Sequence, residues 1–257
     1  MEQLKGKHAL VTGGGRGIGL AIARELLRHG ASVTLAGRSE AALDAAVAEL
    51  SPLGAVRSQR MDVAESASVQ HGIAAAAAAA GRIDILVNNA GQAESAAIGK
   101  TDDALWARML AVNLSGVFYC SRAVLPGMLE AGWGRIVNVA STAGLIGYAY
   151  TAAYCASKHG VVGLTRAMAL EVAAKGVTVN AVCPGFTETD LSREAIANIS
   201  ARTGRSEAEA KAALAAFNPQ KRLVQPEEVA HAAVWLCLPA SAAMNGQAVA
   251  VAGGEVT

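Results

Sequence analysis

The sequence predicts a doubly wound α/β fold, in which a parallel sheet of about seven strands carries helices on both faces. Short apolar segments alternate with longer helical segments along the 257 residues, and this alternation is typical of parallel sheets. Right-handed crossovers between consecutive parallel strands make such a sheet doubly wound. No linker or shift in composition interrupts the chain, so we expect one domain over residues 1–257.

The N-terminal half supplies four expected strands and three expected helices. Gly30 gives the first helix its stop signal, and Ser39 can cap the second. The third contains seven consecutive alanines, which favour a helix over a functional low-complexity tract. The expected strands span 8–11, 31–36, 55–61 and 83–87, and the expected helices span 20–28, 40–50 and 66–81.

The C-terminal half continues the alternation with expected strands at 134–140, 177–182 and 248–251. Long helical segments span 101–130 and 151–175, and Pro226 suits the first turn of a further helix. Asn113 lies in the middle of the first long segment, where asparagine is unfavourable because its side chain competes for backbone groups. It therefore indicates a helix irregularity or a functional site, with a solvent-facing asparagine as the alternative.

The segment 186–225 interrupts the alternation after the strand at 177–182. It contains a capping signature, Ser206-x-x-Glu209, ahead of an alanine-rich helix. Open α/β sheets bind ligands beyond the carboxyl ends of their strands. We therefore expect a substrate lid at about 187–225, with 189–217 as the most mobile part before substrate binds. Its apolar residues are Phe186, Leu191, Ile196, Ile199, Phe217 and Leu223.

Composition excludes several classes of function. The net charge of +1 gives no reason to expect a nucleic acid or a membrane surface as partner, and no apolar run is expected to approach the length of a membrane span. The four cysteines form no CxxC, and neither they nor the five histidines have metal-ligand spacing, so we expect no metal. Reduced cysteines and the absence of a signal peptide favour the cytoplasm.

A glycine-rich turn, Thr12-Gly13-x-x-x-Gly17-x-Gly19, joins the first strand to the first helix. Glycines let the backbone approach a pyrophosphate, and the helix N-terminus offers free amides. The turn therefore predicts nucleotide binding, although a tight β–α turn without a ligand is the alternative. The loops after the other strands meet at the same sheet edge and carry Asp62, 88–91, Ser141, and Pro184 with Gly185.

Tyr154 and Lys158 are four residues apart in a helical segment and therefore point the same way. A free tyrosine has a pKa near ~10, and a nearby ammonium lowers that value by favouring the phenolate. The pair could act as a tuned proton donor and acceptor, but such pairs also occur by chance on exposed helices. Ser141 is expected to reach the same crevice from the adjacent strand.

Together these motifs resemble the classical short-chain dehydrogenase/reductase family over essentially the whole chain. The resemblance rests on the glycine turn, Asn88-Asn89-Ala90-Gly91, Asn113, Ser141, Tyr154-x-x-x-Lys158, and Pro184-Gly185 before Thr187, in the family's order. It implies a Rossmann fold in which Tyr154 is the general acid/base and Lys158 lowers its pKa while binding the nicotinamide ribose. It further implies that Ser141 hydrogen-bonds the substrate carbonyl and that Asn113 holds a water for proton relay. The residues expected to contact the cofactor are Gly13, Gly15, Arg16, Gly17, Ile18, Gly19, Arg38, Asp62, Val63, Asn89, Ala90, Gly91, Tyr154, Lys158, Pro184, Gly185, Thr187 and Thr189.

The residues favour an NAD(P)-dependent carbonyl reductase or alcohol dehydrogenase over two other readings. A nucleotide-sensing binding protein would not need Ser141, Tyr154 and Lys158. An extended-branch epimerase or dehydratase has a different glycine spacing and a longer chain. Among members of the family, the sequence most resembles 3-oxoacyl thioester reductases and related ketoreductases. The lid has a slight excess of basic residues, which could bind a phosphate-bearing thiol carrier or could be an ordinary solvated helix face. Cyclic ketones, sugars and polyols remain alternative substrate classes.

The end of the second strand favours NADP(H), with NAD(H) as the alternative. An acidic residue there would bind the adenosine ribose and repel the extra phosphate of NADP, but this chain has Gly37. Arg38 and Arg16 could clamp that phosphate, unless both merely face solvent. The apolar helices 101–130 and 151–175 predict a homotetramer or at least a homodimer, as the resemblance also implies.

Overall fold

The computed structural model describes residues 2–256 and contains a seven-stranded parallel sheet with the order β3-β2-β1-β4-β5-β6-β7. The order reverses between β1 and β4, and all neighbouring strands run parallel, which confirms the doubly wound Rossmann fold. The strands are β1 (His8–Thr12), β2 (Ser32–Gly37), β3 (Val56–Arg60), β4 (Ile85–Asn88), β5 (Gly134–Val139), β6 (Val177–Pro184) and β7 (Ala248–Val251).

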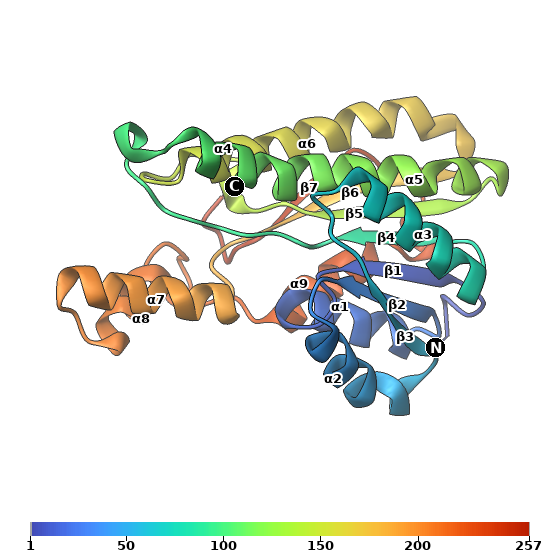
Figure 1. The fold of residues 1–257 in the computed structure, drawn as a ribbon, viewed down its shortest axis with the longest axis horizontal. Helices are drawn as coiled ribbons and strands as arrows, with labels where there is room; N and C mark the ends of the chain where they lie inside the picture. Colours follow the sequence, from blue (N-terminus) through green and yellow to red (C-terminus); the bar gives the residue numbers. More distant parts are fainter. Residues whose placement is uncertain (1, 257) are drawn as a thin grey trace.

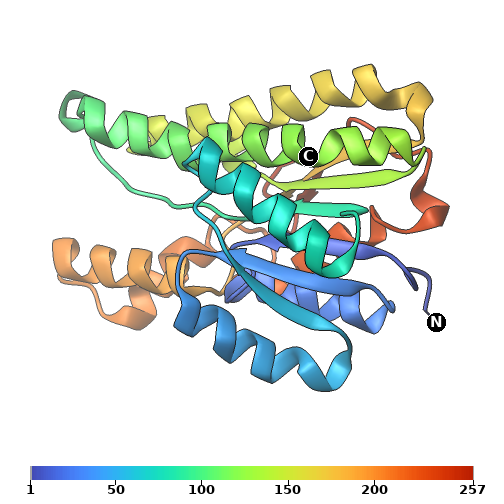
Figure 2. The same ribbon diagram turned by 45° about the vertical axis from the view of Figure 1, so that its right-hand side comes forward.

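Helices cover both faces of the sheet, as Figures 1 and 2 show. One face carries α1 (Gly17–Arg28), α2 (Glu40–Leu50) and α9 (Pro226–Trp235), and the other carries α3 (Ser66–Ala80), α5 (Gly116–Glu130) and α6 (Ala152–Val172). The central strands β1, β4, β5 and β6 are buried along their whole length because the sheet contributes to a core on each side. In β1, for example, Ala9 and Val11 face one core and Leu10 faces the other.

The long helical segment expected at 101–130 is interrupted. It consists of α4 (Asp103–Leu110), one turn of π-helix (Ala111–Ser115) and α5. Asn113 lies in that turn and is fully buried, so the predicted irregularity is confirmed and a solvent-facing asparagine is wrong.

The expectation that no apolar run approaches the length of a membrane span is wrong for this segment. Asp103–Glu130 is one helical run of 28 residues that is long and apolar enough to cross a membrane, by length and composition alone. A core helix of a soluble protein can pass the same test. In this structure α5 packs on β4, β5 and α3.

The lid contains two helices, α7 (Asp190–Thr203) and α8 (Glu207–Ala215), which project from the sheet in Figure 1. The predicted cap of α8 is confirmed, because Ser206 N donates to Glu209 Oε2 at 2.8 Å while Ser206 Oγ accepts from Glu209 N. Helix α7 was not expected. Its N-cap is Thr189, whose backbone N–H donates to Ser192 Oγ at 3.0 Å.

Candidate active site

The glycine turn after β1 is held in a conformation that requires glycine. Gly13 and Gly17 have φ angles of +63° and +54°, in the left-handed region. Gly13 N donates to the carbonyl of Ala36 at 2.7 Å, which ties the turn to β2. Helix α1 begins at Gly17 and directs the amides of its first turn, including that of Ile18, toward the crevice edge. This backbone cradle fits a dinucleotide pyrophosphate.

The loop after β4 is bonded directly to that turn. Thr12 Oγ1 accepts from the backbone N–H groups of Asn89 and Ala90, each at 3.0 Å. The Asn89 side-chain amide donates to the carbonyls of Thr12 and Gly13 at 3.0 and 3.1 Å. A Cβ on Gly19 would lie only 2.5 Å from Asn89 Nδ2, so the two motifs fit together only without a side chain there.

Asn113 joins the loop after β4 to helix α6. Its Oδ1 accepts from Gln92 N at 2.9 Å, and its Nδ2 donates to Gln92 O at 2.9 Å and to Ser157 Oγ at 3.2 Å. A Cβ on Gly91 would lie 3.3 Å from Asn113 Oδ1 and 3.8 Å from Lys158 Nζ. The π-helical turn therefore places Asn113 against α6, the helix that carries Tyr154 and Lys158.

Ser141, Tyr154 and Lys158 meet at the carboxyl end of β5. Ser141 follows β5, and its side chain lies close enough to Tyr154 to lower the pKa of that phenol. Tyr154 lies one turn before Lys158 on α6. Lys158 is 5% exposed, and its ammonium donates to the carbonyl of Val139 at 2.8 Å. The structure thus brings the predicted pair and the predicted serine together.

The electrostatics of the pair differ from the sequence expectation. Burial raises the pKa of Tyr154, and the neighbouring Ser141 hydroxyl opposes that rise. Lys158 was expected to lower this pKa, but its Nζ lies 5.7 Å from the Tyr154 ring centroid and bonds to Val139 instead. Burial also lowers the pKa of Lys158 to about 8, so the ammonium is itself destabilised.

The second strand ends at Gly37, where no carboxylate stands. Arg38 is exposed directly after it. Arg16 is also exposed, and its Nη1 lies 3.3 Å from Asp190 Oδ2 at the start of the lid. Arg38 therefore follows the end of β2 directly, whereas the guanidinium of Arg16 in the glycine turn already has an acidic neighbour.

The remaining predicted cofactor residues lie along the same edge. Asp62 Oδ1 accepts a hydrogen bond from Ala64 N at 3.0 Å. Val63 packs closely against Gly116, because a Cβ added to that glycine would lie 3.0 Å from the Val63 side chain. The Thr187 hydroxyl donates to the Gly185 carbonyl at 2.9 Å after Pro184 ends β6. Thr189 touches the glycine turn, because a Cβ on Gly17 would lie 3.3 Å from its Cγ2. Gly15 packs against α2, where its Cβ would lie 3.2 Å from the Ala42 carbonyl.

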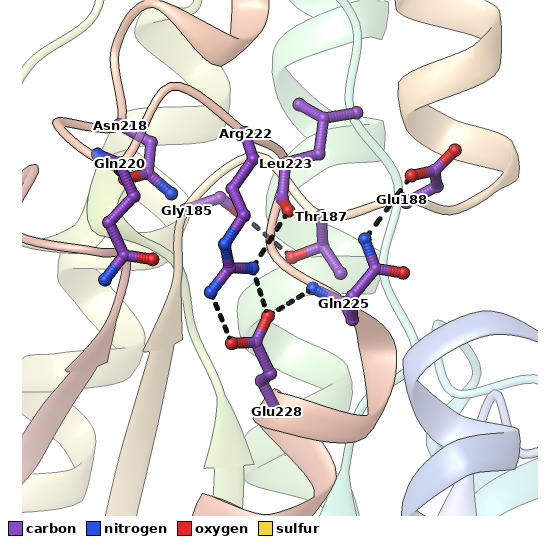
Figure 3. A network of polar contacts seen from close by, with 9 residues as sticks. All are labelled: Gly185, Thr187, Glu188, Asn218, Gln220, Arg222, Leu223, Gln225 and Glu228. Carbon is purple, nitrogen blue, oxygen red and sulfur yellow. Dashed lines mark hydrogen bonds and ion pairs between the residues drawn. The ribbon is translucent and has the colours of Figure 1, made fainter.

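The base of the lid is held by a polar network that the sequence did not reveal (Figure 3). Arg222 donates to both carboxylate oxygens of Glu228 at 2.6 and 2.7 Å, and Gln225 N donates to the same carboxylate at 2.8 Å. Gln225 Nε2 also reaches Glu188 at 3.4 Å. The network ties the return of the lid to the start of α9. A bridge between Thr187 and Val224 pairs the two ends of the lid.

Sequence reasoning also missed Gln92 and Tyr148. Gln92 directly follows the Asn-Asn-Ala-Gly motif, so its position next to the site could have been noticed. Tyr148 lies between Ser141 and Tyr154, but nothing in its spacing indicates its partners. Across residues 2–256, no group of histidine, cysteine or acidic side chains is arranged to hold a metal ion.

A family model described as short chain dehydrogenase matches residues 7–200. The chain belongs to the short-chain dehydrogenase family. Membership confirms the resemblance and makes this protein an NAD(P)-dependent oxidoreductase that acts on CH–OH groups. This dehydrogenase is 44% identical to a putative ketoacyl reductase of Streptomyces coelicolor over 249 residues, which cover 96% of this chain and 95% of that protein.

The chain is also similar to a second relative and to a solved structure. A D-beta-hydroxybutyrate dehydrogenase of Cupriavidus necator is 40% identical over 257 residues, which cover 98% of this chain and 99% of that one. A crystal structure of an actinorhodin polyketide ketoreductase variant with NADPH superposes with a TM-score of 0.94 at 42% identity, covering 98% of both chains.

Proposed function

We propose that this protein is an NADPH-dependent ketoreductase that reduces a ketone to a secondary alcohol. The observation that carries the proposal is the contact between Ser141 and Tyr154 beside buried Lys158, at the same sheet edge as the glycine turn. The proposed catalytic residues are Asn113, Ser141, Tyr154 and Lys158, and the bond from Asn113 Nδ2 to Ser157 on α6 supports including the asparagine. An intact site of this kind favours an enzyme over a nucleotide-sensing binding protein.

The chemistry follows from the positions of these side chains. When bound, the reduced nicotinamide supplies the hydride. Tyr154 donates a proton to the developing alkoxide, and Ser141 stabilises the same oxygen with a hydrogen bond. The raised pKa of Tyr154 keeps the phenol protonated for donation. Lys158 would bind the nicotinamide ribose. Asn113 would hold a water for proton relay, as the resemblance implies, and its side chain also bonds the backbone of Gln92 directly after Gly91.

The corner at Gly37 supports NADPH over NADH. No carboxylate at the end of β2 repels the 2′-phosphate, and exposed Arg38 and Arg16 can bind it. The NADPH in the actinorhodin ketoreductase structure supports the same preference.

A 3-oxoacyl thioester is the substrate class best supported by the relatives. Besides the putative ketoacyl reductase, a 3-oxoacyl-[acyl-carrier-protein] reductase of Vibrio cholerae is 39% identical over 251 residues. The similarity to the hydroxybutyrate dehydrogenase favours a second candidate, an NAD-dependent hydroxyacyl dehydrogenase. The test is a screen of 3-oxoacyl thioesters, cyclic ketones, sugars and polyols with NADPH and NADH. We expect NADPH oxidation with thioesters, and no oxidation with any ketone would contradict the proposal.

We further propose that the chain forms a homotetramer or homodimer in the cytoplasm, through α4, α5 and α6. These helices expose large apolar side chains, with Leu170 82% exposed. The others are Trp106, Phe118 and Leu129. Such a patch favours burial against a second copy.

We also propose that the chain is one domain with its lid at about 187–225, ordering over bound substrate. The β-bridge between Thr187 and Val224 and the Arg222–Glu228 ion pair fix the base of the lid. Helices α7 and α8 project away from that base (Figure 1). Residues 189–217 should exchange amide hydrogens faster than β4 and β5. Equal protection of the lid and the central strands would contradict this.

A further inference from the structure

Three aromatic rings stand together near Thr142, the residue after Ser141, and we name Tyr148, Phe186 and Phe217 the aromatic wall. The Tyr148 ring centroid lies 6.0 Å from that of Phe186 and 5.8 Å from that of Phe217, both edge to face. Phe186 and Phe217 are 5.4 Å apart. The rings come from the loops after β5 and β6 and from the end of the lid, so they join the substrate side of the site.

The wall is joined to the proposed carbonyl site by one hydrogen bond. The Tyr148 hydroxyl lies 2.7 Å from Thr142 Oγ1, and Thr142 is buried directly after Ser141. A substrate whose carbonyl oxygen meets Ser141 and Tyr154 must therefore place its adjoining substituent near these rings. Apolar rings that pack edge to face favour an apolar substituent.

A carboxylate supports the wall from the C-terminal tail. Glu255 Oε1 accepts a hydrogen bond from the Tyr148 hydroxyl. Glu255 Oε2 is buried and has no hydrogen-bond partner within residues 2–256. It faces the backbone after β6, because a Cβ on Gly185 would lie 2.7 Å from it. Over the same residues, no lysine, arginine or histidine forms an ion pair with Glu255.

We propose that Glu255 makes this site select neutral ketones and reject anionic ones. The substrate is then a 3-oxo ester or thioester with an apolar substituent, and not a free 3-oxo acid. The inference rests on the proposed function, and it separates the ketoacyl reductase activity from that of a hydroxybutyrate dehydrogenase. Glu255 acts as a specificity-determining residue that need not touch the reacting atoms.

The physical reason is that, within residues 2–256, no cation pairs with Glu255 and offsets its charge. A substrate carboxylate beside the wall would lose water and meet a second negative charge in a partly buried space, where salt screens charges poorly. An ester or thioester carries no charge, so it loses little hydration free energy when it enters the site. Specificity of this kind comes from the repulsive element against the wrong ligand.

Equilibrium binding tests the inference apart from turnover. Protein saturated with NADP⁺ is titrated calorimetrically with acetoacetate and with methyl acetoacetate, and the ratio of the two Kd values is compared among variants. Glu255→Gln removes the charge and keeps a side chain that can accept from Tyr148. We expect the parent to bind the ester at least about tenfold more tightly than the acid, and Glu255→Gln to shrink that ratio at least about fivefold.

Two control variants separate charge from packing. Tyr148→Phe keeps the carboxylate and should keep the preference for the ester. Glu207→Gln removes an exposed charge from α8 and should leave the ratio unchanged. Equal affinity of the parent for both ligands, no binding of either, or an unchanged ratio in Glu255→Gln would overturn the inference. Reduction of methyl acetoacetate by the parent with NADPH tests the proposed function separately, so the two failures are distinguishable.

Discussion

The ammonium of Lys158 donates a hydrogen bond to the carbonyl oxygen of Val139 at 2.8 Å. The contact anchors α6 to the end of β5 and fixes the distance between the lysine and Tyr154. Because the ammonium is almost completely buried, its pKa falls to about 8. The charge of Lys158 is therefore complete only below that pH.

Lys158 should give the enzyme an alkaline limit. As the pH rises through about 8, the ammonium loses its proton and its bond to the cofactor ribose weakens. We expect kcat/KM for ketone reduction and cofactor affinity to fall together above that pH. Lys158→Ala should have a low kcat/KM and a low cofactor affinity at every pH, and neither should fall further as the pH rises through about 8. A parent profile that stays flat to pH ~10, the value for an unperturbed lysine, would contradict the assignment.

Cofactor preference should reverse when an acidic residue is placed at the end of β2. In Gly37→Asp a carboxylate would accept from the ribose hydroxyls of NADH and repel the phosphate of NADPH. The parent should prefer NADPH by about tenfold or more in kcat/KM, since a charge-assisted bond contributes about 1.5–3 kcal/mol. Gly37→Asp should favour NADH.

Arg38→Ala is the matched control for that measurement. It should weaken NADPH use while leaving NADH use nearly unchanged, because only the phosphate contact is removed. Arg16 already pairs with Asp190, so its replacement should have the smaller effect. Better use of NADH than NADPH by the parent would show that the corner at Gly37 is misread.

The sheet and the motif positions could be predicted from the sequence because they depend on local patterns. Apolar strands, glycine spacing and a four-residue helical repeat are visible without tertiary contacts, and the loops they place at one edge are found there. The direction of the Tyr154 pKa could not be predicted, since burial controls it and spacing does not reveal burial. Glu255 is 107 residues from Tyr148, and no periodic pattern connects positions so distant.

Low pH should destabilise the fold through His8. This buried side chain in β1 has Nδ1 2.8 Å from the Gly81 carbonyl and Nε2 2.8 Å from Thr34 Oγ1, which suits a neutral ring. Burial lowers its pKa from 6.5. The unfolded chain therefore binds the proton more readily, and the stabilisation present above pH 6.5 is lost as the pH falls.

Denaturant unfolding between pH 5 and 7.5 measures this effect, with a slope of up to about 1.4 kcal/mol per pH unit from one proton. His8→Gln should be less stable at pH 7.5 but flatter across the range. His71→Gln changes an exposed histidine and should follow the parent. A parent slope retained in His8→Gln would remove His8 from the explanation.

Assembly should depend on the exposed face of α4, α5 and α6. Leu170→Glu places a charge on that face, where the parent exposes 82% of the leucine. We expect light scattering at micromolar concentration to give a dimer or tetramer mass for the parent and a smaller mass for the variant. Leu53→Glu alters an exposed leucine outside these helices and should behave like the parent. A monomeric parent would contradict the proposed assembly.

The central claim, that Tyr154 donates the proton in ketone reduction, is tested most directly by the Tyr154→Phe variant. The measurement is NADPH oxidation with a 3-oxoacyl thioester, alongside NADPH affinity by fluorescence titration. Only the hydroxyl is lost, so we expect turnover to fall by at least about 100-fold while NADPH still binds with nearly parental affinity. Turnover within a few-fold of the parent would contradict the claim.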